Sequence, residues 1–179
     1  APQTAAPAAQ PPAEKPAPAL KVGTAAPDFE LPMMGGGTVK LSDAAGSKVV
    51  VIALWAAYND YCADQLRAVQ QIAAQYDEAD VQVLAINDRD TATIAKQFLD
   101  KHQLDVPVAL DINGEIAAAY GIAELPYTAV VDQQGVIQKI QKGYIPSLQS
   151  DIGGKLRSLL ESPAAPASEE ADDTGDGPQ

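Results

Sequence analysis

The apolar residues of this chain are spaced with two different periods, one typical of strands and one typical of helices. Nearly continuous apolar runs rich in Val and Ile occur at 48–54 and 81–86, as expected for central strands covered on both faces. Between these runs, apolar side chains recur at the helical spacing, which predicts a helix with one buried stripe. The stripe consists of Cys62, Leu66, Val69, Ile72, Ala73 and Tyr76.

The remaining pattern predicts further strands that alternate with helices. Shorter strands are expected at 28–31, 38–41, 106–110, 127–131 and 136–140, and the first two and the last two read as hairpins. Short helical segments are expected from Ser42 and at 115–120. Two longer helices are indicated by the stripes Ile94, Phe98, Leu99 and Leu148, Ile152, Leu156, Leu159, Leu160, although Gly153 and Gly154 weaken the second. This order predicts an α/β domain with a central mixed sheet flanked by helices and an added N-terminal β-hairpin.

The two ends of the chain differ in composition from the part between them. Residues 1–20 are almost entirely Ala, Pro and Gln, which predicts a disordered linker. Residues 161–179 carry six acidic residues and no Lys or Arg, which predicts a disordered acidic tail. The expected globular domain therefore spans 21–160.

The charge balance excludes some classes of partner. The chain has a net charge of −12, and the 17 acidic and 11 basic residues within 21–160 leave that part at −6. An acidic surface repels phosphate backbones, so nucleic-acid binding is not expected. No apolar run approaches the ~20 residues that span a bilayer. The Pro/Ala-rich start fits an exported protein whose signal or membrane anchor precedes Ala1, and it also fits an arbitrary boundary of a cytosolic protein.

Cys62 is the only cysteine, and it follows a buried strand at the predicted start of a helix. Asn59 stands three residues before it, at the spacing of a Cys-x-x-Cys pair. Because an amide cannot attack sulfur, a dithiol cycle within this chain is not possible. One histidine, His102, together with one cysteine makes a zinc site improbable, and no metal or cofactor is expected.

Several segments resemble the redoxin branch of the thioredoxin superfamily, which includes peroxiredoxin-like proteins and the TlpA/ResA-type periplasmic thiol-disulfide oxidoreductases. The segments are Gly23–Pro32, similar to the entry strand; Trp55–Cys62, similar to the active-site motif; Asp111–Glu115 and Ala119–Ile122; and Leu125–Asp132, similar to the strand that opens with a cis-proline. The resemblance implies a thioredoxin-like fold over about 22–160. It places Asn59 at the first, nucleophilic cysteine and Cys62 at the resolving cysteine.

The resemblance also implies a site for a protein or peptide partner. A peptide strand would pair with the backbone at Leu125 and Pro126 by β-augmentation. Asn59 would lie beside it, and an aromatic rim would come from Trp55, Tyr58 and Tyr61, with Trp55 equally compatible with the core. Asn59 is also expected to serve as the N-cap of the following helix.

Two chemical roles stay open for Cys62. Burial and the neighbouring Asp60 would raise its pKa and leave it inert, whereas the helix N-terminus would lower its pKa. The favoured hypothesis is a partner-binding module of the cell envelope, periplasmic or otherwise exported, that has lost the dithiol pair. The alternative is a one-cysteine oxidoreductase or peroxidase that forms a mixed disulfide at Cys62 and uses an external thiol, although the peroxidase Pro-x-x-x-Thr-x-x-Cys frame is not met. A third hypothesis gives the acidic tail the role of recruiting a basic partner.

Overall fold

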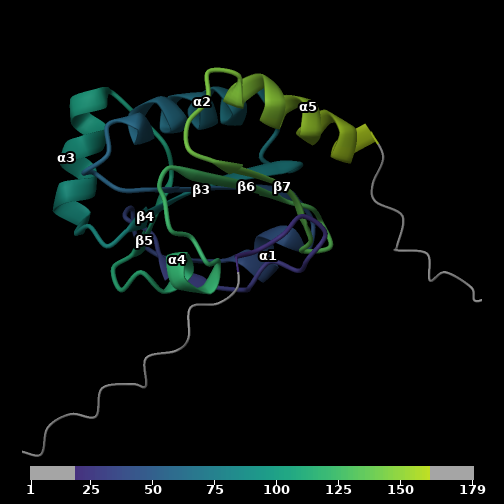
Figure 1. Ribbon diagram of the computed structural model, residues 1–179, viewed down its shortest axis with the longest axis horizontal. Helices are drawn as coiled ribbons and strands as arrows, with labels where there is room; N and C mark the ends of the chain where they lie inside the picture. The colour runs from purple at the N-terminus through teal and green to yellow at the C-terminus, as the bar shows by residue number, and fades with distance from the viewer. Residues whose placement is uncertain (1–18, 162–179) are drawn as a thin grey trace, which may run out of the picture.

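The computed structural model describes residues 19–161 of the chain (Figure 1). The predicted linker over 1–20 and the predicted acidic tail over 161–179 lie almost wholly outside these described residues.

A five-stranded mixed sheet forms the centre of the molecule, with the strand order β5-β4-β3-β6-β7. Its strands are β3 (Val49–Trp55), β4 (Val81–Asp88), β5 (Val108–Asp111), β6 (Tyr127–Val131) and β7 (Ile137–Lys142). β3 runs parallel to β4 and antiparallel to β6, and all seven of its residues are buried. The continuous apolar runs therefore correspond to the central strands, as predicted.

Helices cover both faces of this sheet (Figure 1). One face carries α2 (Tyr61–Gln75), α3 (Ala92–His102) and α5 (Leu148–Glu161), and the other carries the short helices α1 (Leu41–Ala45) and α4 (Glu115–Ala119). Alternate residues of β3 point to the two faces, so that Val51 packs under α2 and α5 while Ile52 packs toward α1 and α4. The predicted layered α/β architecture is confirmed.

Both edges of the sheet are covered by N-terminal segments. The predicted hairpin is present as β1 (Glu30–Pro32) and β2 (Thr38–Lys40), which pair antiparallel. The turn between them lies along β5, where the Met34 N–H donates to the Val108 carbonyl at 2.8 Å. On the opposite edge, Ala25 bridges Val136, the residue just before β7. Covered edges leave fewer unpaired backbone groups for unspecific pairing with other chains.

Two details of the predicted helices differ in the structure. Ile94 was assigned to the buried stripe of α3, but it is 44% exposed, and Ala95 is buried in its place. Gly153 and Gly154 do not interrupt α5, which runs unbroken through them. Tyr76, beyond the end of α2, donates its hydroxyl to the Gly153 carbonyl at 3.0 Å and so connects the end of α2 to α5.

None of the helices within residues 19–161 has the length and apolarity required to cross a lipid bilayer.

Candidate functional site

The N-terminus of α2 meets the loop before β6, and Asn59 connects the two. Its Nδ2 donates to the Leu125 carbonyl oxygen at 2.8 Å, and its Oδ1 accepts from the Tyr61 N–H at 3.0 Å. Both polar groups of the amide are therefore engaged with the backbone. One side chain thus fixes the position of the loop relative to the helix.

Helix α2 begins one residue later than the sequence predicted. Its N-cap is Asp60, which has helical torsion angles and makes no side-chain capping bond. Cys62 is accordingly the second helical residue and not the third. Asn59 still supplies a cap in chemical terms, because its side-chain oxygen accepts one of the free N–H groups of the first turn.

The Cys62 thiol is fully buried beneath this helix start, with 0% of the residue exposed. Burial raises its pKa to about 11; a backbone contact with Ala56 lowers the pKa slightly, and the charge of Asp90 raises it further. The expected contribution of Asp60 is not the one observed, since Asp60 lies out in solvent 4.0 Å from Lys101. At neutral pH this thiol is protonated and shielded from solvent.

The loop beside Asn59 ends in a cis peptide bond between Leu125 and Pro126. Pro126 is buried, whereas Leu125 is half-buried and packs against the cluster that contains Cys62. The Pro126 carbonyl accepts from the Gly143 N–H at 2.8 Å, beyond the end of β7. The loop is thus held on one side by Asn59 and on the other by the end of the sheet.

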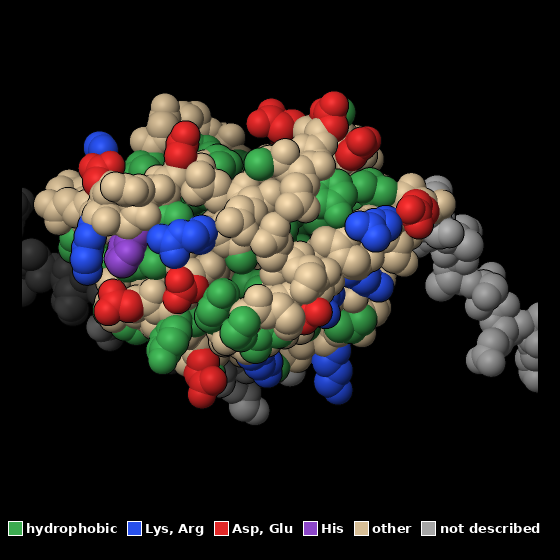
Figure 2. Space-filling view, turned by 90° about the horizontal axis from the view of Figure 1, so that it is seen from above, with side chains coloured by type: hydrophobic (Ala, Val, Ile, Leu, Met, Phe, Trp, Pro, Cys, Tyr) green, Lys and Arg blue, Asp and Glu red, His purple; other side chains and the backbone are tan. Residues whose placement is uncertain are grey.

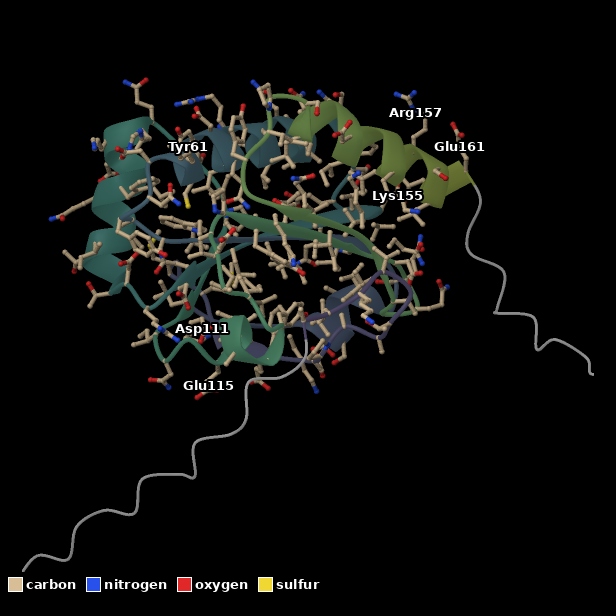
Figure 3. All side chains as sticks on the ribbon, viewed as in Figure 1. Tyr61, Asp111, Glu115, Lys155, Arg157 and Glu161 are labelled. Carbon is tan, nitrogen blue, oxygen red and sulfur yellow. The ribbon has the colours of Figure 1, made fainter. Side chains whose placement is uncertain are left out.

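Of the three aromatic residues predicted to form a rim, two lie at the surface. Tyr58 is 78% exposed and Tyr61 is 67% exposed. Figure 3 shows Tyr61 on the side of the sheet that carries α2. Trp55, in contrast, is fully buried and packs on Phe98 with their ring centroids 5.1 Å apart. The assignment of Trp55 to the rim is therefore corrected: it belongs to the core between β3 and α3.

Gln65 is a site residue that the sequence analysis missed. It is fully buried one turn after Cys62, and its Nε2 donates to the Tyr127 carbonyl and to Thr128 Oγ1, both at 2.9 Å. These bonds tie α2 to the first residues of β6, directly after Pro126. A polar residue three positions after Cys62, adjacent to the apolar Leu66, was the available signal.

Asp90 was also missed, and it orders the loop that carries Tyr58. Its Oδ2 accepts from the Ala57 N–H at 2.7 Å and from Asn87 Nδ2 at 2.9 Å. The Asp90 N–H donates in return to Asn87 Oδ1 at 3.2 Å. Nothing in the sequence between residues 87 and 90 indicates this contact, because it depends on β4 ending beside β3.

A family model described as the AhpC/TSA family matches residues 22–140. The chain belongs to the AhpC/TSA family. The resemblance to redoxins that was read from the segments above is thereby confirmed.

Three proteins similar to this chain are named as thiol-disulfide oxidoreductases or thioredoxins. The chain is 35% identical over 127 residues to the thiol-disulfide oxidoreductase ResA of Oceanobacillus iheyensis; the match covers 69% of the chain and just under two thirds (66%) of that relative. A Chlorobium tepidum structure assigned as the thiol:disulfide interchange protein DsbE is 29% identical, with a TM-score of 0.72, over 79% of this chain and 99% of that one. The exposed lipoprotein thioredoxin Etrx1 of Streptococcus pneumoniae is 28% identical, with a TM-score of 0.63, over 74% and 100% of the two chains. The thioredoxin-like fold is therefore confirmed.

In this AhpC/TSA-family chain, His102 is the last residue of α3. Its ring packs on Phe98 with the centroids 4.5 Å apart, and its carbonyl accepts from Arg67 at 3.4 Å. In Figure 2 the purple histidine lies between blue basic side chains on this face. Within residues 19–161, no group of three or more His, Cys, Asp or Glu side chains is arranged to hold a metal ion.

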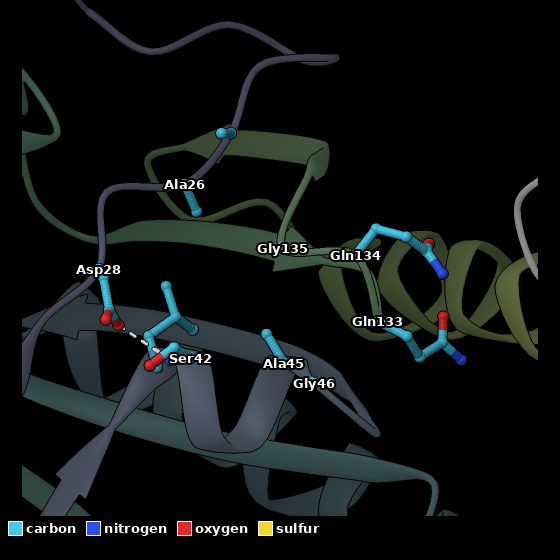
Figure 4. Close-up of a pocket in the computed structure, with 10 residues that line it drawn as sticks. Ala26, Asp28, Ser42, Ala45, Gly46, Gln133, Gln134 and Gly135 are labelled. Carbon is cyan, nitrogen blue, oxygen red and sulfur yellow. Dashed lines mark hydrogen bonds between the residues drawn. The ribbon is translucent and has the colours of Figure 1, made fainter. Parts of the chain in front are cut away.

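A hollow of about 260 Å³ lies beside α1 and the β6–β7 turn (Figure 4). Its one charged lining residue, Asp28, accepts from the Ser42 N–H at 2.9 Å and from the Phe29 N–H at 3.0 Å. The remaining lining residues are small or neutral, among them Ala45, Gly46 and Gln134. None of the candidate site residues contributes to this hollow.

Proposed function

We propose that this chain is a thioredoxin-fold binding module that has lost the dithiol pair and holds a protein or peptide partner beside Asn59, Leu125 and Pro126. The observation that carries the proposal is the state of Asn59. Its amide occupies the position of the nucleophilic thiol and is bonded at both ends to backbone. Asn59 therefore has a structural role in this chain and no role in thiol exchange.

Thiol-disulfide exchange requires a thiolate that attacks one sulfur of the substrate and displaces the other. Asn59 supplies no sulfur, and Cys62 is buried with a pKa of about 11. Attack by Cys62 would require both deprotonation and opening of the helix start. These properties argue against the one-cysteine oxidoreductase or peroxidase, which needs an accessible thiolate.

The surface around Asn59 has the composition of a recognition site. Tyr58 and Tyr61 are large exposed side chains on either side of it, and tyrosine is enriched at protein interfaces because it combines apolar area with a hydroxyl group. The half-buried Leu125 adds apolar surface and a backbone N–H for pairing with an extended peptide. The partner is therefore held by non-covalent contacts, without a mixed disulfide.

We place the module outside the cytoplasm, at the cell envelope. The support is its 28% identity to a thioredoxin named as an exposed lipoprotein. A redox-inactive member of such a family would act there by binding, without exchanging disulfides.

Site-specific photocrosslinking in the organism of origin tests the binding role. The photoreactive residue p-benzoylphenylalanine replaces Tyr58 or Tyr61 in separate variants, and Ile94 or Ile112 in matched controls that are also exposed. Adducts of the same mass at 58 and 61, absent at 94 and 112, are expected. Equal labelling at all four positions, or at none, would overturn the proposal, and an adduct that reductant releases from Cys62 would favour the oxidoreductase instead.

A further inference from the structure

A second hollow lies on the other side of the loop that contains Leu125 and Pro126. It has a volume of about 250 Å³ and is lined by Gly121, Ile122, Ala123, Glu124, Tyr127 and Lys142. The loop after α4 forms one wall, and the facing ends of β6 and β7 form the other, where Tyr127 pairs with Lys142. The lining residues therefore flank Leu125 and Pro126 on both sides in the sequence.

The hollow and the exposed tyrosines lie on opposite faces of the sheet. Tyr127 packs into the core toward α4, whereas the next residue, Thr128, faces Gln65 of α2. Figure 3 shows Tyr61 on the α2 side and Glu115, at the start of α4, on the opposite side. Successive side chains of an extended strand point to opposite faces. A strand that pairs at Leu125 would thus direct one side chain toward Tyr61 and the next toward the hollow.

The lining combines an apolar floor with two charged groups at the rim. Tyr127 is only 3% exposed and forms the floor together with Ile122. Glu124 and Lys142 are both exposed, and neither takes part in an ion pair within residues 19–161. A ligand side chain would meet an ammonium group and a carboxylate that no neighbour already neutralises.

We propose that this hollow is a specificity pocket that receives an aromatic side chain with a polar tip, a tyrosine of the bound peptide. The proposal rests on the partner-binding function above. An apolar cavity of about 150 Å³ already accommodates benzene, so the volume here is sufficient for a phenol ring. The ring packs on Tyr127 and Ile122, its face meets the Lys142 ammonium, and its hydroxyl donates to the Glu124 carboxylate.

Peptide titration followed by NMR on the uniformly ¹⁵N-labelled full chain tests the pocket. The probes are acetylated and amidated pentapeptides of alanine with either tyrosine or alanine at the centre. The tyrosine peptide is expected to bind ~10-fold more tightly than the alanine peptide, since an aromatic ring is buried, and to shift the amide signals of Ile122, Tyr127 and Lys142. Replacing Lys142→Ala weakens the tyrosine peptide ~3-fold. The matched control Lys139→Ala, on the same strand but opposite Val130, leaves binding unchanged.

The outcomes separate this pocket from the binding function itself. If both peptides shift Tyr58, Tyr61 and Leu125 with equal affinity, the pocket is overturned while the binding function stands. If Lys142→Ala and Lys139→Ala weaken binding of the tyrosine peptide equally, the proposed pocket is also overturned. If neither peptide shifts any signal at up to ~5 mM, a concentration that detects affinities worth only ~3 kcal/mol, both proposals fail.

Discussion

The side-chain amide of Asn59 donates a 2.8 Å hydrogen bond to the carbonyl oxygen of Leu125, a residue 66 positions further along the chain. The same amide accepts from the Tyr61 N–H at 3.0 Å. A thiol at this position would offer only weak hydrogen bonds. Asn59 therefore joins the helix start to the loop before β6.

Replacing Asn59→Ala removes both bonds and is expected to lower the free energy of unfolding by ~1–3 kcal/mol, a capping bond plus a partly buried carbonyl bond. Urea denaturation followed by circular dichroism measures the change. Asn59→Asp is the comparison variant, because it keeps the oxygen that accepts from Tyr61 but replaces the donor to Leu125 with a carboxylate oxygen that repels the carbonyl. An Asn59→Ala variant as stable as the wild type would show that the two bonds contribute nothing.

The alkylation rate of Cys62 is expected to depend steeply on pH. With a pKa of about 11 in place of the ordinary 9.0, the folded protein carries ~100-fold less thiolate at neutral pH than an ordinary cysteine. Iodoacetamide labelling followed by mass spectrometry should therefore be slow at pH 7 and rise with a midpoint near pH 11. The urea-unfolded chain is the control and should react with an ordinary midpoint. A folded-state midpoint below ~8.5 would instead indicate a reactive thiol.

Replacing Asn59→Cys places a second cysteine three residues before Cys62 and should create redox activity. Residues three apart at a helix start lie close enough for a disulfide bridge. We expect an intrachain disulfide in oxidising buffer, seen as the loss of free thiols, and catalysed reduction of insulin with dithiothreitol where the wild type gives only the background rate. Asn59→Ser serves as control because it opens the same position without a thiol. Insulin reduction by the wild-type chain above background would contradict the proposed function.

The buried Gln65 predicts a pH-dependent variant. Replacing Gln65→Glu removes the donor to the Tyr127 carbonyl and Thr128 Oγ1 and buries an acid, so burial holds the pKa of this carboxyl above its unfolded value of ~4.3. The folded state then binds the proton more tightly than the unfolded state. Relative to wild type, the variant keeps its stability below about pH 4 and loses it as the pH rises through the folded pKa.

Gln65→Leu is the matched variant for this comparison. It has no titrating group and should lose ~1–3 kcal/mol at every pH, since it removes the buried amide that donates to the Tyr127 carbonyl and to Thr128 Oγ1. Thermal unfolding between pH 4 and pH 8 measures both variants. Parallel profiles for Gln65→Glu and Gln65→Leu would show that the carboxyl at this position is not perturbed by burial.

Sequence patterns predicted most of the fold because they report burial directly. The runs at 48–54 and 81–86 became β3 and β4, and the hairpin at 127–131 and 136–140 became β6 and β7. Errors arose where a periodic pattern does not determine which face is covered. Ile94 fits the helical spacing of α3, but the packing of α3 buries Ala95 and leaves Ile94 in solvent.

The candidate site could be predicted only in part. The position of Asn59 before Cys62 is visible in the sequence, since a motif spacing is local. Gln65 and Asp90 were missed because their partners, Tyr127 and Ala57, are 62 and 33 residues away. For Trp55 the sequence left two locations open, because an aromatic residue at the end of a strand fits a surface rim as well as a core. Its contact with Phe98 decides for the core.

By itself, the sequence determined the order of the elements, the single cysteine and the amide three residues before it, because these depend on local spacing and residue identity alone. The tertiary structure decided that Cys62 is buried with a raised pKa, that Asn59 bonds to Leu125, and that Tyr58 and Tyr61 remain exposed. These properties depend on which distant segments enclose each side chain. Desolvation and hydrogen bonding across the fold follow from that enclosure. A local pattern indicates which face of a helix is buried, but it does not identify the distant groups that cover that face.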